Sequence, residues 1–337
     1  MIMMKAISLI SGGLDSILAA RLIKEQGLEI IPVKFKIPFC HSDKKKEGGA
    51  KDTSCLVREA LGVELKEIDI SEDFLKLLVR PKHGFGSNIN PCIDCKILMF
   101  SKARELMREF GASFVITGEV LGQRPMSQYR KALELIERKS GLEGLLLRPL
   151  SAGLFPESLP EKEGWVKRDK LMVFCGRQRR PQMELAKEFK IEGYPNPAGG
   201  CLLTDPAFAK RLRDMIKHQQ LDLDNAALLK IGRHLRLTPA AKLIVGRCQR
   251  EDEELVRLAM QGDYLFMPGD DLAGATALGR GEFSDELIKL SCNITCRYCD
   301  LNGKISADIF YRRLPEASLR AVNSTPEAEK GIANLRI

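Results

Sequence analysis

The 337-residue sequence predicts an α/β fold, with a parallel sheet in its first part and a small α+β domain after it. In the first part, short apolar runs alternate with helical patterns, which is typical of a parallel sheet with right-handed crossovers. From about Leu221 short strands return and helices become fewer, which indicates a separate module. We therefore expect a first domain at residues 1–205, a linker helix at 206–222, a second domain at 223–315 and a loosely held tail at 316–337.

The first domain should open with a buried strand followed at once by a helix. A long amphipathic helix further on should end at Gly111, because glycine accepts the left-handed conformation common at helix C-termini. The expected order is strand 6–10, helix 17–23, strand 28–35, helix 50–61, strand 63–70, helix 96–110, strand 114–118, strand 170–174 and helix 181–189.

The rest of the chain should begin with a helix at 206–217 and continue with the α+β module. Its expected strands are 234–237, 242–246, 264–266 and 305–311, and its expected helices are 251–260 and 282–292. Three stretches of the chain have loop composition: a charged segment at 41–51, a breaker-rich segment at 80–90 that we expect to be an active-site flap, and an irregular segment at 194–201.

Composition limits the class of protein. Hydrophobic residues make up 44% and charged residues 29%, which is typical of a globular protein rather than a disordered one. No apolar run approaches the roughly 20 residues that span a bilayer, so we expect no membrane partner and a cytoplasmic location. The net charge of +8 suits a polyanionic partner, although a generic solvated surface is the alternative. Aromatic residues are only 6%, so a base-stacking surface is not obvious.

The most informative motif directly follows the first predicted strand and precedes a helix. Its two glycines allow a tight turn, so backbone N–H groups, the positive helix end and small hydroxyls can face an anion. The Gly-Lys-Ser/Thr ending of a Walker loop is absent. An ordinary strand–helix turn is the alternative. The stretch resembles the SGGxDS signature of the PP-loop ATP pyrophosphatases, which bind ATP and release pyrophosphate; it consists of Ser11, Gly12, Gly13, Leu14, Asp15 and Ser16.

Cys92 and Cys95 form a Cys-x-x-Cys pair at the start of a predicted helix, where a thiol pKa is lowered and the thiolate is favoured. Two thiolates are too few for a closed zinc or iron–sulfur site. Cys201, in an irregular Gly-Gly loop, is the candidate third ligand. Three thiolates on a [4Fe–4S] cluster would leave one iron open for sulfide or a substrate atom. A persulfide on one cysteine that the other resolves, and inert thiols, remain alternatives.

Three further cysteines have the Cys-x3-Cys-x2-Cys spacing of radical SAM enzymes: Cys292, Cys296 and Cys299. Such a motif should lie early in a long barrel, whereas here only 38 residues follow it. We interpret these cysteines as small buried core residues, with an auxiliary metal site as the alternative.

Residues 1–205 resemble the PP-loop tRNA-thiolating enzymes, the tRNA 4-thiouridine synthases and the tRNA 2-thiouridylases. The stretch from Asn90 to Cys95 is similar to the NPCxxCN stretch of the 2-thiouridylases, with Lys96 in place of the last Asn. The stretch from Thr117 to Gln128 is similar to TGExLGQxxSQ of the 4-thiouridine synthases. Leu147-Arg148-Pro149-Leu150 resembles the RPL that follows in those enzymes, and Cys201 falls where the family places its second sulfur-handling cysteine.

The chain also departs from these families. We find no THUMP or rhodanese domain and no β-barrel tail of the 2-thiouridylase kind. Residues 231–311 instead resemble the RNA-binding domain of the NFACT family, through Arg233 to Leu237 and Lys242 to Arg247. This resemblance implies a module that contacts RNA.

The resemblance implies ATP-dependent thiolation of a tRNA uridine, in which adenylation of a carbonyl oxygen releases pyrophosphate and sulfur then displaces AMP. It implies tRNA, Mg²⁺ and a sulfur donor, either sulfide or a cysteine desulfurase, as partners; a homodimer is left open. Asp15 would orient the metal and Gly118 would let the nucleotide approach closely. The resemblance implies that the ATP site consists of Ser11, Gly12, Gly13, Leu14, Asp15, Ser16, Phe35, Gly118 and Gln123. It implies that sulfur is handled by Cys92, Cys95 and Cys201. Candidates for contacts with tRNA phosphates, with simple solvation as the alternative, are Arg148, Arg177, Arg179 and Arg180.

Two rival functions remain. A PP-loop ligase or amidotransferase-like enzyme acting on a small molecule would need neither a cluster nor an RNA module. An RNA-binding adaptor would use its nucleotide site for regulation only.

Overall fold

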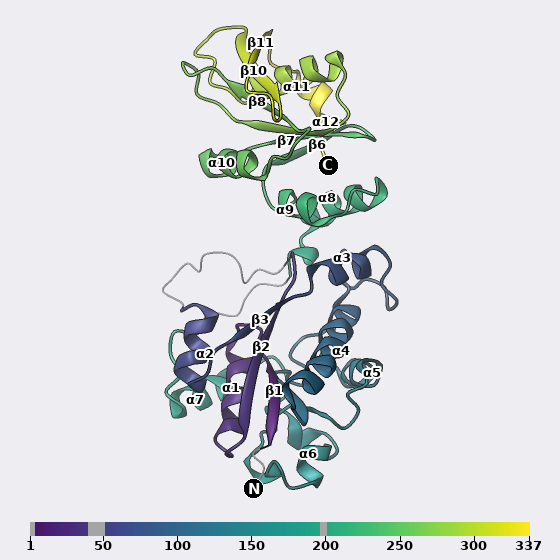
Figure 1. Cartoon of the computed structure of the whole chain (residues 1–337), viewed down its shortest axis with the longest axis vertical. Helices are drawn as coiled ribbons and strands as arrows, with labels where there is room; N and C mark the ends of the chain where they lie inside the picture. Colours follow the sequence, from purple (N-terminus) through teal and green to yellow (C-terminus); the bar gives the residue numbers. More distant parts are fainter. Residues whose placement is uncertain (1–3, 40–50, 196–200) are drawn as a thin grey trace. The chain divides into compact units, whose positions relative to one another are not determined.

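The computed structural model describes residues 4–39, 51–195 and 201–337. Contacts divide the chain into two compact units, Met1–Thr204 and Asp205–Ile337 (Figure 1). Most of the charged segment expected at 41–51 and of the irregular segment before Cys201 lies outside the described residues. Among the described helices, none has the length and apolar character needed to cross a bilayer.

The first unit is built on a five-stranded parallel sheet in the order β3-β2-β1-β4-β5. The order places β1 at the centre, because the chain crosses to β2 and β3 on one side and to β4 and β5 on the other. Its strands are β1 (Lys5–Leu9), β2 (Glu29–Lys36), β3 (Lys66–Asp69), β4 (Phe114–Thr117) and β5 (Leu146–Leu147). Its helices are α1 (Leu14–Lys24), α2 (Thr53–Leu61), α3 (Ser71–Val79), α4 (Cys92–Phe110), α5 (Arg130–Ser140), α6 (Leu159–Lys162) and α7 (Arg180–Glu188).

Two helical layers cover this sheet (Figure 1). Alternate residues of β1 enter different cores: Ala6 packs under α1, α2 and α7, whereas Ile7 packs under α4 and α5. This alternation follows from the period of two in a strand. The expected parallel α/β fold is thereby confirmed.

The second unit is an antiparallel six-stranded sheet in the order β11-β10-β8-β9-β7-β6. One face packs against α11 and α12, and the other against α9 and α10. Its strands are β6 (Arg233–Thr238), β7 (Ala241–Val245), β8 (Tyr264–Pro268), β9 (Ala277–Gly281), β10 (Ala307–Arg313) and β11 (Arg320–Ser324). Its helices are α8 (Pro206–Lys217), α9 (Leu223–Leu228), α10 (Gln249–Leu258), α11 (Asp285–Arg297) and α12 (Glu329–Ala333).

Two expected elements are wrong. Residues 316–337 are no loose tail, because β11 pairs with β10 along its length and Ile332 of α12 is fully buried. The expected strand at 170–174 is not formed: Lys170 ends a 3-10 helix, and the Met172 and Phe174 N–H groups donate to the Pro149 and Leu150 carbonyl oxygens (2.8 Å each). The bridge next to this segment joins Cys175 to Leu121. In addition, α8 belongs to the second compact unit rather than standing alone as a linker.

Candidate functional site

The turn after β1 is held by its own serines. The Ser11 N–H donates to Ser16 Oγ (3.2 Å), and the Ser16 hydroxyl donates to the Gly13 carbonyl oxygen (2.8 Å). Gly12 has a φ of +82°, which glycine adopts without strain. These contacts place the turn directly at the N-terminus of α1.

The N-terminus of α1 has no side-chain cap, because the capping position is Gly13. Its first backbone N–H groups therefore lack an acceptor from a capping side chain, and the helix dipole adds a partial positive charge. Asp15 lies in this first turn. Its Oδ2 accepts a hydrogen bond from Gln123 Nε2 (3.0 Å), while its Oδ1 is buried without a hydrogen-bond partner among the residues that the structure describes. A buried carboxylate oxygen without a partner is a candidate ligand for a hard cation such as Mg²⁺.

Gly118, which follows β4, lies next to this turn. A Cβ at this position would lie 2.4 Å from the Ser16 nitrogen and 2.5 Å from the Asp15 carbonyl carbon. Gly118 thus lets the start of α1 pack against the end of β4. The close neighbour of a Cβ at this position is therefore the chain's own backbone, and the approach of a nucleotide to Gly118 stays a prediction.

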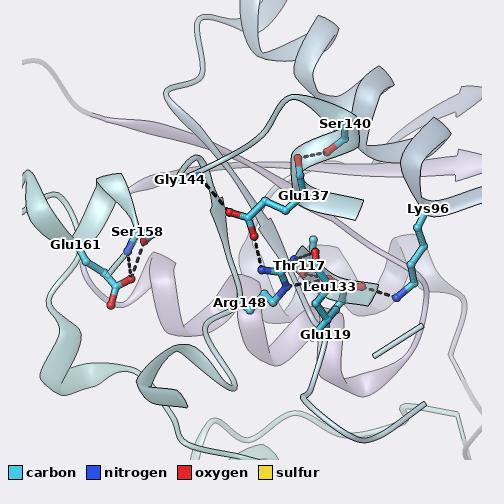
Figure 2. A network of polar contacts seen from close by, with 10 residues as sticks. All are labelled: Lys96, Thr117, Glu119, Leu133, Glu137, Ser140, Gly144, Arg148, Ser158 and Glu161. Carbon is cyan, nitrogen blue, oxygen red and sulfur yellow. Dashed lines mark hydrogen bonds and ion pairs between the residues drawn. The ribbon is translucent and has the colours of Figure 1, made fainter. Parts of the chain in front are cut away.

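A buried polar network lies behind this edge of the sheet (Figure 2). Glu119 forms ion pairs with Lys96 of α4 and with Arg148, whose Nε lies 3.0 Å from Glu119 Oε2. Arg148 also pairs with Glu137 of α5 (2.6 Å) and donates to the Leu133 carbonyl oxygen (3.2 Å). Burial alone would raise the pKa of Glu119, but Lys96 and Arg148 outweigh it, and the pKa is lowered.

The network corrects the assignment of Arg148 as a tRNA contact. Arg148 is only 5% exposed, and two carboxylates and a carbonyl oxygen take up its guanidinium donors. The other three predicted arginines lie together before and at the start of α7. Arg177 and Arg180 are exposed, whereas Arg179 is half-buried with an unpartnered Nε. Of the four predicted arginines, these three remain candidates for phosphate contacts.

Cys92 and Cys95 lie in the first turn of α4, where the Cys95 N–H donates to the Pro91 carbonyl oxygen (2.8 Å). The expected lowering of the thiol pKa is wrong for Cys92. Burial raises the pKa of its thiol, and the opposing effects of Lys96 and Arg124 do not overcome it.

Cys201 approaches from a segment distant in the sequence. Its Sγ lies 3.7 Å from the carbonyl oxygen of Phe39, just beyond β2. The residues after Cys201 are anchored to the loop that leads into α4: the Ile89 N–H donates to the Leu203 carbonyl oxygen (3.2 Å) and Asn88 Nδ2 to the Thr204 carbonyl oxygen (2.7 Å). The fold thereby ties the segment carrying Cys201 to the segment carrying Cys92.

Among the described residues, the cysteines are not grouped as the ligands of a metal ion. Across residues 4–39, 51–195 and 201–337, no three His, Cys, Asp or Glu side chains are grouped closely enough to hold a metal ion. The described residues therefore do not fit the expected [4Fe–4S] cluster, and we derive no step through one.

The segment expected to be a flap, residues 80–90, is hydrogen-bonded to α4. Asp94 accepts hydrogen bonds from the backbone N–H of His83 (2.8 Å) and faces its Nδ1 at the same distance. No pattern in the sequence singled out His83 and Asp94 as a pair. A polar residue inside a helical pattern near two cysteines was the only available signal.

The chain matches two family models in separate segments. Residues 2–153 match the family described as thiamine biosynthesis protein (ThiI). Residues 232–335 match the NFACT protein RNA binding domain. The resemblances inferred from the sequence are confirmed. We refer below to these stretches as the ThiI-matched and NFACT-matched segments.

Curated relatives match part of the chain. The chain is 33% identical over 121 residues to the tRNA-specific 2-thiouridylase MnmA of Pelobacter propionicus, covering 34% of this chain and 33% of the relative. It is 29% identical over 146 residues to a probable tRNA sulfurtransferase of Thermococcus kodakarensis, covering 43% and 36%. The chain thus spans about a third of the length of these relatives.

Solved structures were also compared. A 4-thiouridine synthetase–RNA complex with bound ATP is 22% identical, with a TM-score of 0.35 over 66% of this chain and 53% of that one. The C-terminal part of a fibronectin/fibrinogen-binding protein from Streptococcus suis is 11% identical, with a TM-score of 0.28 over 79% and 98%.

Phe35 is half-buried on the face of β2 that packs beneath α4, and its assignment to the ATP group stays a prediction. It lies in the core beneath α4, with Ile31 and Val33, because these alternate residues of β2 share one face. The turn at Ser11–Ser16 leads instead into α1, on the other face. Because side chains alternate between the two faces along a strand, the sequence of β2 could have placed Phe35 on the face opposite to α1.

The three cysteines of the NFACT-matched segment lie in its core. Cys292 and Cys296 are fully buried on α11, and the Cys296 thiol donates to the Ser324 carbonyl oxygen (3.2 Å). Burial raises the pKa of Cys292 to about 12 and that of Cys299 to about 11, so both remain protonated. These features support the interpretation as core residues.

Proposed function

We propose that this protein carries out ATP-dependent sulfur transfer to a uridine in tRNA. The observation that carries the proposal is the uncapped N-terminus of α1 with the unpartnered Asp15 Oδ1, inside a ThiI-matched segment that also bears Cys92 and Cys95. Relatives of the chain are named as a tRNA-specific 2-thiouridylase and a probable tRNA sulfurtransferase.

The first step activates the uridine carbonyl. Its oxygen attacks the α-phosphate of ATP, an O–P bond forms, and pyrophosphate leaves. The backbone N–H groups at the start of α1 and the hydroxyl of Ser11 would hold the phosphates, and Asp15 would hold Mg²⁺, which neutralises the developing charge when bound. Gln123 keeps Asp15 oriented through its 3.0 Å hydrogen bond.

The second step delivers sulfur. In the persulfide form of the proposal, the outer sulfur of one cysteine attacks the activated carbon, and AMP leaves with the original oxygen. A second cysteine then attacks the inner sulfur, forms a disulfide and frees the thiouridine; a thiol reductant restores the pair. Cys92, Cys95 and Cys201 are the candidates, because hydrogen bonds tie the segments that carry them. The donor that loads the persulfide is sulfide with an oxidant or a cysteine desulfurase.

Single substitutions test whether these cysteines deliver the sulfur. Cys92→Ser, Cys95→Ser and Cys201→Ser are each assayed with unmodified tRNA, Mg²⁺-ATP and a sulfur donor. The expected result is loss of thiouridine by about a hundredfold or more for at least two of the three. Cys248→Ser, an exposed cysteine of the second unit, is the control and should keep full activity. Full activity of all three variants would show that sulfur comes from elsewhere.

The iron–sulfur alternative is tested by anaerobic purification. A brown protein with absorbance near 400 nm that is lost in the three cysteine variants would support the cluster over the persulfide. A colourless, active protein would exclude it. The cytoplasmic location is part of the proposal, since both ATP and tRNA are found there.

A further inference from the structure

A cluster of aromatic rings lies on one face of the sheet in the second unit. Tyr264 of β8 packs against Phe283 with ring centroids 5.0 Å apart. Tyr311 of β10 stacks on Phe266 at 6.1 Å and 25°. Phe266 is fully buried, whereas the other three rings are half-buried. Four aromatic rings thus meet in a region of the fold although the whole sequence is poor in them.

Strand register brings two arginines to the same face. Arg313 pairs directly with Tyr264 across β10 and β8, and Arg320 of β11 pairs with Tyr311. Residues that are directly opposite in antiparallel strands share a face. The Arg313 guanidinium lies 5.7 Å from the centre of the Tyr264 ring. The arginines of β10 and β11 therefore form one row with the aromatic rings on this face of the sheet.

A glycine makes room for the outermost ring. A Cβ at Gly279 would lie 2.6 Å from Phe283 Cζ and 3.0 Å from Phe266 Cε2. Gly279 is directly opposite Tyr264 in β9, so Phe283 occupies the space above it and completes the row. The half-buried rings are thereby fixed in place by the backbone beneath them.

Charge indicates what this surface binds. Arg313 is exposed and forms no ion pair with any residue that the structure describes, and the ion pair of Arg320 with Glu316 (3.2 Å) is a surface one. Acidic residues occupy the first turn of α11, next to Phe283: Asp285 and Glu286. A bound polyanion should therefore run along the β10–β11 side, with its flat groups over the rings.

We propose that Tyr264, Tyr311 and Phe283, together with Arg313 and Arg320, form a stacking platform for an unpaired stretch of RNA. Nucleobases stack on aromatic rings and on guanidinium planes, and arginines neutralise the phosphates between them. Unpaired bases are needed because the bases of a duplex are already stacked on each other. The proposal rests on the RNA role proposed for the chain, and it names the surface of the NFACT-matched segment that performs it.

The first test uses a labelled single-stranded oligoadenylate and fluorescence anisotropy on the full chain, with ATP present throughout. Oligoadenylate contains no uridine, so its binding does not report on the thiolation site. Tyr311→Leu should weaken binding by about five- to a hundredfold, because one stacked base is lost. Tyr311→Phe keeps the ring and should bind within about twofold of the unaltered chain.

The second test uses salt. Arg313→Gln should lower the slope of log affinity against log salt by about 0.7, the value for one phosphate contact on a single strand. Arg250→Gln is the matched control, because it removes an equally exposed arginine from α10, on the other face of the sheet. Arg313 is exposed, so this variant tests the platform even if Tyr311→Leu fails to fold.

Three outcomes would overturn parts of the account. If Tyr311→Leu binds like Tyr311→Phe and Arg313→Gln behaves like Arg250→Gln, the platform is wrong while RNA binding stands. If duplex RNA binds as tightly as the single strand, stacking is not the mode of binding. If the unaltered chain binds no RNA, the proposed RNA role fails as well.

Discussion

Gly118 shows how a single residue sets the geometry of the candidate site. The start of α1 packs against it so closely that a methyl group would overlap the backbone of Asp15 and Ser16. Sequence reasoning marked Gly118 correctly as a position of close approach. The backbone of α1 as its neighbour was not expected, because nothing local in the sequence shows that α1 begins beside the end of β4.

Gly118→Ala is expected to lower the free energy of unfolding of the first unit by about 1–3 kcal/mol or more, since overpacking displaces α1. The change is measured by thermal melting without ATP. ATP affinity, measured by calorimetry, should fall with it. Gly13→Ala is the control for stability, because its Cβ would lie 3.5 Å from Ser11 Oγ, an ordinary contact. Equal melting temperatures for the two variants would contradict the packing role.

Lys242 is a buried cation in the second unit. It lies between Arg236 and Arg280 in register on β6, β7 and β9, and its Nζ has no hydrogen-bond partner in the described part of the chain. Burial lowers the pKa of Lys242 to about 7; Asp214 raises it, and Arg236, Arg211 and Arg280 lower it further. At neutral pH this side chain is therefore near the midpoint of its titration.

The sign of the resulting pH dependence follows from linkage. Because the pKa in the folded state is below its ordinary value near 10.5, the unfolded chain binds more protons between about pH 7 and 10.5. Stability of the second unit should therefore rise with pH over this range. Lys242→Met should remove that rise and stabilise the unit at pH 7 by about 1–4 kcal/mol. Hydrogen exchange of β7, corrected for intrinsic rates, measures the stability at pH 7 and its dependence on pH. A destabilised Lys242→Met variant with an unchanged pH dependence would contradict the assignment of that dependence to Lys242.

At the scale of elements, the ion pairs of Glu119 and Arg148 hold α4, α5 and the ends of β4 and β5 together (Figure 2). Removing one partner leaves a buried charge without compensation, which is far costlier than losing a surface pair. The network therefore acts as a structural support behind the cysteines and the turn at Ser11–Ser16.

Arg148→Met is expected to destabilise the first unit by about 3–5 kcal/mol, as seen in urea denaturation followed by Trp fluorescence. The control is Arg180→Gln, whose side chain is 87% exposed and should change stability by less than about 0.5 kcal/mol. A stable Arg148→Met variant with weakened tRNA binding would restore the rejected assignment as a tRNA contact.

Some elements are predictable from the sequence for a physical reason. Buried parallel strands need continuous apolar runs, so β1, β2 and β4 were found near their observed positions. By contrast, β11 consists of Arg-Ala-Val-Asn-Ser, which is mostly exposed and does not differ in composition from a loop. Only its pairing with β10 makes it a strand. Likewise, Arg148 looked like a surface residue because Glu119 and Glu137, its partners, are distant in the sequence.

At the scale of the whole molecule, the chain has two units with separate proposed tasks. Activation and sulfur delivery belong to the ThiI-matched segment and its continuation to Cys201, and RNA contact belongs to the NFACT-matched segment. Motifs revealed this division from the sequence, because they need only local spacing. The aromatic platform was missed, since its rings come from β8, β10 and Phe283, which precedes the N-cap of α11, and only the fold brings them together.

The central claim is that the chain uses ATP to replace a uridine oxygen of tRNA with sulfur. The most direct measurement incubates the purified full chain with unmodified tRNA, Mg²⁺-ATP and a sulfur donor. Mass spectrometry of the digested nucleosides then follows thiouridine, alongside AMP and pyrophosphate. The account predicts thiouridine, AMP and pyrophosphate in equal amounts, all lost in Asp15→Asn. Unchanged nucleosides, or pyrophosphate release that does not depend on tRNA, would contradict it.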